Sequence, residues 1–167
     1  VLKEADVDFL QLLVASLPPR RMALLRSAGQ IAHEEGMPLH LVGGAVRDLL
    51  LGRPSEDLDL VVEGDAERLA YGIAKRLSGE VIARSQFSTA KVKVEGVSLD
   101  LTTARREHYP RPGALPQIAP GTMEEDLARR DFSINAMAFP LHTEAPAQLL
   151  DLHGGRSDLD RGLIRVL

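Results

Sequence analysis

The sequence contains no cysteine and no tryptophan, and aromatic residues make up only 4% of it. The lack of cysteine excludes disulfide bonds and cysteine-ligated zinc, and it is typical of a reducing compartment, so we expect a cytoplasmic protein. With few aromatic residues, the core has to be built from aliphatic side chains, which favours helices packed on a sheet over an aromatic-rich β-sandwich. We therefore expect a mixed α/β fold.

Long apolar runs and an excess of basic residues are also missing. No apolar run approaches the roughly 18 residues that cross a bilayer, and no signal-peptide pattern opens the chain, so a membrane partner is not expected. The net charge of -4 means that any nucleic-acid contact has to come from a local patch or from another part of a longer protein. The start at Val1 favours a domain taken from a longer polypeptide.

The hydrophobic pattern divides the chain into two parts. Apolar residues recur at helical spacing through residues 7–36, interrupted at Pro18-Pro19, and predict two helices. We interpret residues 1–36 as a helical lead-in and residues 37–167 as the main domain. In the first part of that domain, strands are expected at residues 38–42, 57–63, 80–84, 89–95 and 97–104, and helices at 45–52 and 65–79.

The second part of the main domain has more chain breakers. Residues 108–122 hold four prolines and two glycines, which predicts an irregular segment, and we expect a mobile lid because loops of this length usually serve binding. Residues 127–141 are expected to form a helix or turn that leads into apolar sequence. The chain end is expected to form a strand, a glycine turn, a polar link and a strand, with Asp158-Leu159-Asp160 in a turn.

A paired glycine stands between an expected strand and an expected helix, in "LVGGAVRDLL". Glycine lets a phosphate approach the backbone N–H groups at such a bend, and Arg47 one turn later can add a charged fork. Gly43, Gly44 and Arg47 are therefore candidate nucleotide-binding residues. The alternative is a tight turn followed by a surface arginine.

Asp57 and Asp59 flank Leu58, so an extended backbone directs both carboxylates to one face and Leu58 to the core. Mg²⁺, which prefers oxygen ligands and shares them with phosphates, is the natural counter-ion for such a pair. Asp100 lies in an expected strand between two leucines and can complete a three-carboxylate, two-metal centre for phosphoryl transfer. The alternatives are solvated acids at a loop end and a solvent-facing strand residue.

The segment "RRDFSINAMAF" supplies the remaining candidates, Arg129, Arg130, Asp131 and Asn135. Adjacent arginines usually form a solvated face, but beside a triphosphate they neutralise charge on the leaving pyrophosphate. Asp131 is a candidate for orienting one of them.

Taken together, "LVGGAVRDLLLGRPSEDLDLVV" and "RRDFSINAMAF" resemble the head domain of bacterial class II tRNA nucleotidyltransferases and poly(A) polymerases, within the polymerase-beta-like nucleotidyltransferase superfamily. The resemblance runs from about Pro38 to Leu167, and the lead-in is similar to the linker of longer members. It implies metal ligation by Asp57 and Asp59, with Asp100 as the third catalytic carboxylate. It also implies a triphosphate site formed by Gly44, Arg47, Arg129 and Arg130.

The sequence departs from the family pattern at one motif residue and in the element that selects the base. Ser133 stands where threonine is commoner. Family members select the base with an E-D-x-x-R element on a helix after the head, which would lie beyond Leu167. Residues 125–129 spell that pattern but precede the arginine motif, so we interpret the match as coincidence.

The resemblance implies a Mg²⁺-dependent transfer of AMP or CMP from ATP or CTP to the 3′ end of RNA, with tRNA as the expected acceptor. A-adding, CC-adding, CCA-adding and poly(A) synthesis remain open, as does the oligomeric state. Two rival hypotheses are a nucleotidyltransferase acting on a small molecule or a protein, and a nucleotide-binding module without turnover.

Overall fold

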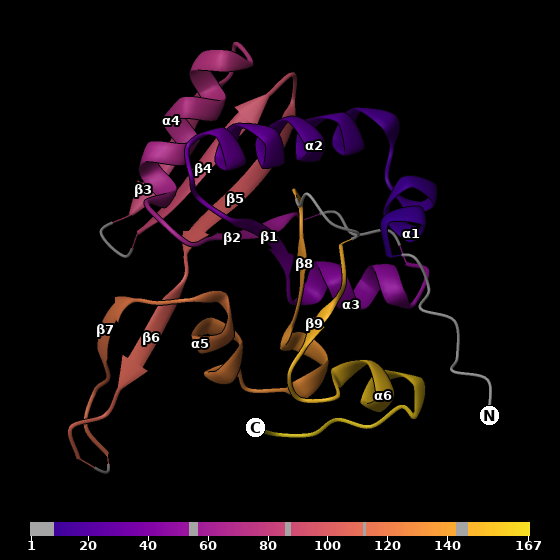
Figure 1. Ribbon diagram of the computed structural model, residues 1–167, viewed down its shortest axis with the longest axis vertical. Coiled ribbons are helices and arrows are strands. Elements are labelled where there is room, and N and C mark those ends of the chain that lie inside the picture. Colours follow the sequence, from indigo (N-terminus) through magenta and orange to yellow (C-terminus); the bar gives the residue numbers. More distant parts are fainter. Residues whose placement is uncertain (1–8, 54–56, 86–87, 112, 143–146) are drawn as a thin grey trace.

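A mixed β-sheet with helices packed against it forms the body of the protein (Figure 1). The computed structural model describes residues 9–53, 57–85, 88–111, 113–142 and 147–167. Within these residues, the strands of the main sheet are β1 (Leu39–Val42), β2 (Asp59–Val62), β3 (Glu80–Ser85), β4 (Thr89–Val94), β5 (Val97–Thr103), β8 (Met137–Pro140) and β9 (Leu150–Asp151). Their spatial order is β3-β4-β5-β2-β1-β8-β9.

The pairing pattern makes this sheet mixed. β2 and β5 run parallel, with Asp59 opposite Asp100, and the other neighbouring strands pair antiparallel. β4 and β5, which match the strands expected at 89–95 and 97–104, form a hairpin whose turn is Glu95-Gly96, and both turn residues have positive φ. The expected mixed α/β class is confirmed.

Helices pack on both faces of the sheet (Figure 1). They are α1 (Phe9–Ser16), α2 (Pro19–Glu34), α3 (Gly44–Leu50), α4 (Ala66–Arg76), α5 (Met123–Ala128) and α6 (Gly155–Asp160), with a short 3₁₀ helix η1 (Ser133–Asn135). The two helices expected before residue 36 are confirmed, and Pro19 opens the second, where a missing N–H has no cost. None of the described helices is long and apolar enough to span a membrane.

Apolar and polar side chains alternate along β4, so they point to opposite faces of the sheet. On β4, Ala90, Val92 and Val94 are buried in the main core, on the side where α2 and α4 lie. The opposite face has its own smaller core, in which Val42 and Val61 pack with Met123 and Leu127 of α5. Lys91 and Asp59 therefore belong to the face that α5 approaches.

The proline-rich segment is more regular than the sequence predicts. β6 (Arg105–His108) pairs antiparallel with β7 (Gln117–Pro120) in a separate two-stranded sheet, so the expected irregular conformation is wrong for residues 117–120. Pro120 is tolerated because it is the last residue of β7 and because each strand of a two-stranded sheet is an edge strand. Pro112 lies outside the described residues.

The expected turn at Asp158-Leu159-Asp160 is also wrong, because these residues form the last part of α6. The chain then continues extended, and Val166 forms an isolated bridge with Phe132 rather than a full strand. Asp158 is completely buried, whereas a polar link between elements would leave it exposed to solvent.

Candidate functional site

The bend between β1 and α3 requires glycine for two reasons. Gly43 has φ 65° and ψ −126°, a combination that side chains strongly disfavour. A Cβ atom on Gly43 would also lie 2.8 Å from Nη1 of Arg130, so the arginine packs directly against the bend. The backbone N–H of Gly43 donates to the carbonyl of Met137 (3.1 Å), which ties the bend to β8. The structure thus brings Gly43 and the second arginine of the "RRD" motif into contact.

Arg47 and Asn135, 88 positions apart in the sequence, meet through a short hydrogen bond. Nη1 of Arg47 donates to Oδ1 of Asn135 at 2.7 Å, and Nε donates to Oδ1 of Asp48 at 2.9 Å. Both side chains are partly buried. Two predicted nucleotide-binding residues are therefore joined, one from α3 and one from η1.

The three predicted carboxylates lie on two neighbouring strands or just before them: Asp57 precedes β2, Asp59 begins it, and Asp100 lies on β5. Asp57 and Asp59 are exposed on either side of the buried Leu58, as their alternation predicts. The backbone N–H of Asp100 donates to the carbonyl of Leu58 (3.2 Å), and Asp100 stands opposite Asp59 in the parallel register. Both aspartates of the sheet therefore point to one face from neighbouring strands.

The electrostatics of Asp59 reflect this clustering. Desolvation raises the pKa of the Asp59 carboxyl above its ordinary value, and the negative charges of Asp100 and Asp57 raise it further. The positive charges of Arg130 and Lys91 act in the opposite direction on the same pKa. Asp59 is thus placed between acidic neighbours and two cations, which is the field expected at a cation or phosphate site.

The donor chemistry of this cluster fits Mg²⁺, because all three side chains offer hard carboxylate oxygens at adjacent positions. Across the part of the chain that the structure describes, no three His, Asp or Glu side chains are gathered closely enough to enclose a metal ion. Oδ2 of Asp100 is instead ion-paired with Nζ of Lys91 at 3.0 Å.

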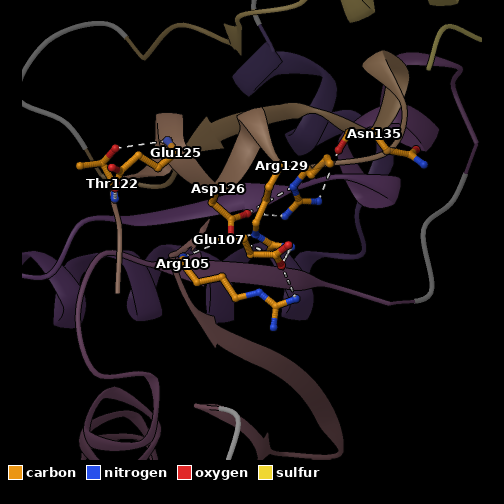
Figure 2. A network of polar contacts seen from close by, with 8 residues as sticks. Arg105, Glu107, Thr122, Glu125, Asp126, Arg129 and Asn135 are labelled. Atoms are coloured by element: carbon orange, nitrogen blue, oxygen red, sulfur yellow. Dashed lines mark hydrogen bonds and ion pairs between the residues drawn. The ribbon is translucent and has the colours of Figure 1, made fainter. Parts of the chain in front are cut away.

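A buried acid outside the predicted site residues holds both arginines, and Figure 2 shows its contact with Arg129. Asp126 of α5 is completely buried. Its Oδ1 accepts from Nε and Nη2 of Arg129 (3.1 and 2.7 Å), and its Oδ2 accepts from Nε and Nη2 of Arg130 (3.3 and 3.0 Å). Each guanidinium therefore presents two nitrogens to one carboxylate oxygen, which fixes its orientation.

Asp126 is thus the acid that contacts both arginines, whereas Asp131, the candidate for orienting one of them, is exposed and stays a prediction. The signal was present in "EDLARR", because residues three and four positions apart share a helix face. Asp126 and Arg129 are two members of the "E-D-x-x-R" match, so that match has a structural role in this fold.

A second acid links the arginines to the two-stranded sheet. Glu107 of β6 lies 3.6 Å from Nη1 of Arg129 and 3.4 Å from Nη2 of Arg105 (Figure 2). The backbone N–H of Arg105 also donates to Asp126 (3.3 Å). The hairpin of β6 and β7 is therefore attached to Arg129 by one ion pair, and to the acid that holds both arginines by the hydrogen bond from Arg105.

The η1 segment is anchored from the chain end. The hydroxyl of Ser133 donates to Oδ2 of Asp158 (2.6 Å), and Nη2 of Arg165 donates to Oδ1 (2.8 Å). The hydrogen bond from Ser133 and the charge of Arg165 lower the pKa of the Asp158 carboxyl below its ordinary value. Asp158 therefore stays ionised and holds in place the segment that carries Asn135.

Comparisons with family models and with individual proteins point to the same family. The family model described as "Poly A polymerase head domain" matches residues 39–165. The chain is 47% identical over 161 residues to the A-adding tRNA nucleotidyltransferase of Halalkalibacterium halodurans, covering 96% of this chain and 38% of that protein.

Two solved structures share the fold at similar identity. A CCA-adding enzyme in its apo form II superimposes with a TM-score of 0.88 at 41% identity, covering 96% of this chain and 38% of that one. The Thermotoga maritima CCA-adding enzyme complexed with tRNA gives a TM-score of 0.79 at 38% identity, covering 96% and 36%. The chain thus spans about two fifths of the length of these proteins.

Proposed function

This chain belongs to the poly(A) polymerase head-domain family, and from that premise we propose that it is the catalytic head of a metal-dependent tRNA nucleotidyltransferase. The proposed reaction adds AMP, CMP or both from ATP and CTP to the 3′ end of tRNA and releases pyrophosphate. The observation that carries the proposal is that Asp59 stands opposite Asp100 and that the charge of Arg130, which packs on the Gly43 bend, acts on Asp59. This combination of acids and a cation supports a site for a metal and a phosphate chain.

We propose that Asp57, Asp59 and Asp100 hold two Mg²⁺ ions, which when bound lower the pKa of the attacking 3′-hydroxyl and neutralise the triphosphate. We propose that Arg47, Arg129 and Arg130 bind the phosphates, and the hydrogen bonds that fix their guanidinium groups support this role. The open backbone at Gly43 and Gly44 lets the phosphates approach closely. Asp131 and Asn135 complete the proposed nucleotide-binding set.

The domain organisation proposed from the sequence accompanies this assignment. Residues 37–167 would form the nucleotidyltransferase head, and the family match over residues 39–165 supports that extent. Residues 1–36 would be a helical lead-in, and Leu13, Leu25 and Ile31 of its two helices pack into the same core as the sheet.

The test of the proposed function is nucleotide incorporation by the full-length protein that carries this chain. Radiolabelled ATP and CTP are supplied separately with tRNA transcripts that end before the 3′-terminal CCA, after C, and after CC. Incorporation that requires Mg²⁺ and a tRNA 3′-hydroxyl is expected. Labelling of protein or of a small molecule in place of tRNA, or nucleotide binding without incorporation, would reject the proposal.

Replacing Asp126 should weaken triphosphate binding by disordering two arginines at once. Because Asp126→Ala leaves a buried cavity and risks unfolding, Asp126→Asn is the informative variant: it keeps the shape and one acceptor oxygen but loses the charge. We expect KM for the nucleotide to rise by roughly tenfold, the size of one charge-assisted hydrogen-bond pair.

The readout separates positioning from folding. Asp126→Asn and Arg130→Met should be non-additive in a double-mutant cycle on KM, since both remove one interaction. Glu95→Gln, an exposed turn residue, is the control. An additive cycle, or an unchanged KM, would contradict a positioning role for Asp126.

A further inference from the structure

Lys91 stands in a cross-strand row with two of the proposed metal ligands. It lies on β4 directly opposite Asp100 of β5, and Asp100 lies directly opposite Asp59 of β2. Directly opposite residues on adjacent strands point to the same face of a sheet. A cation and two carboxylates therefore follow one another across three neighbouring strands.

The first two members of the row are in contact. Nζ of Lys91 is 3.0 Å from Oδ2 of Asp100, and each of the two side chains is 37% exposed. A carboxylate oxygen that is ion-paired with an ammonium group cannot offer the same lone pair to a metal ion without giving up that contact. The ammonium therefore competes with a divalent cation for Asp100.

We propose that Lys91 is an internal counter-ion of the carboxylate row, displaced from Asp100 when a divalent cation binds. The inference rests on the proposed function, since it takes the row as the metal site. Lys91 offsets the repulsion between Asp59 and Asp100 in the metal-free protein, and it weakens metal affinity by the same interaction. It is a positioning residue, because it acts on the reaction through Asp100.

Lys93 provides a matched control on the same strand. It carries the same charge two residues further along β4, on the same face, but it pairs with Ser98 of β5 rather than with an acid of the row. Replacing it removes an equal long-range charge without removing a contact to Asp100. The difference between the two variants therefore isolates the ion pair.

The experiment titrates the 167-residue chain with Mn²⁺, a spectroscopically visible substitute for Mg²⁺, and follows free Mn²⁺ by electron paramagnetic resonance. Lys91→Met is expected to bind Mn²⁺ about two- to fivefold more tightly than the wild type, the size of an exposed ion pair. Lys93→Met should stay closer to the wild type. Lys91→Gln is a second variant in case the methionine perturbs folding.

A second measurement, thermal stability, requires no activity assay. The melting temperature of Lys91→Met without metal should be lower than that of the wild type, and saturating Mn²⁺ should remove the difference. Equal or weaker Mn²⁺ binding by Lys91→Met would overturn the counter-ion role while leaving the proposed function intact. Wild-type protein that binds no Mn²⁺, or binds it equally well as Asp59→Asn, would overturn the metal site itself.

Discussion

Asp59→Asn is expected to abolish nucleotide addition, with a fall in kcat on the order of 10³-fold or more, as removal of a central catalytic group usually gives. Asp59 is the carboxylate on whose pKa the negative charges of Asp100 and Asp57 and the positive charges of Arg130 and Lys91 all act. The amide keeps the side-chain shape but loses the charge that holds a metal ion. The measurement is single-turnover incorporation of labelled nucleotide into tRNA by the full-length protein.

The same substitution should leave the fold as stable as before, or more stable. Partial desolvation and two acidic neighbours raise the pKa of Asp59, so its ionised form is disfavoured in the folded state. This destabilisation is present at pH values above the raised pKa and is relieved as the pH falls through it. The melting-temperature difference between variant and wild type should therefore narrow as the pH is lowered.

Asp160→Asn is the control for Asp59→Asn, because Asp160 is an exposed acid of α6 whose partner is Arg156. It should retain incorporation. If Asp59→Asn kept near-wild-type incorporation, the carboxylate cluster would not be the catalytic centre. If Asp59→Asn lost activity only because it unfolded, its melting temperature would be lower than that of the wild type.

Gly43→Ala is expected to reduce kcat/KM for the nucleotide by roughly 10²-fold, the usual cost of displacing a catalytic group by about 1 Å. The added Cβ would lie 2.8 Å from Nη1 of Arg130, so the guanidinium has to move. That guanidinium also donates to the carbonyl of Asn135 (3.3 Å) and to Asp126, and all three contacts shift together. The strained backbone conformation should also lower the free energy of unfolding by about 1–3 kcal/mol.

Gly52→Ala separates the two effects of the Gly43 substitution. Gly52 also has a positive φ, 66°, but a Cβ there meets nothing within 4 Å. It should therefore lose stability from backbone strain without losing activity. Urea unfolding and steady-state kinetics of both variants are the measurements, and equal activity of the two would contradict the proposed contact between Gly43 and Arg130.

Elements with a strong local period were predicted well, because their hydrophobic residues repeat within a few positions. The helices before residue 36, the strand before Gly43, the helix after it and the β4–β5 hairpin all lie where the sequence places them. The family resemblance drawn from the two motifs is confirmed by the family match. The site assignments for Asp57, Asp59 and Asp100 stay predictions.

Elements that depend on distant partners were predicted poorly. The pairing of β6 with β7 was missed because prolines were counted as breakers without regard to where each one sits on a strand. The helix α6 was missed because its acidic residues resemble a solvated turn, whereas Asp158 is held by Ser133 and Arg165 from elsewhere in the chain.

The sequence by itself determined which functional groups this protein can offer: paired glycines, three aspartates and two adjacent arginines are the groups on which the proposed metal and triphosphate site rests, because the identity of a functional group does not depend on the fold. Only the tertiary structure decided how these groups are held. Asp126 orients both arginines because α5 buries it beneath them, and Lys91 meets Asp100 because the hairpin register sets them opposite each other. Register and burial arise from packing between distant segments, which no local pattern encodes.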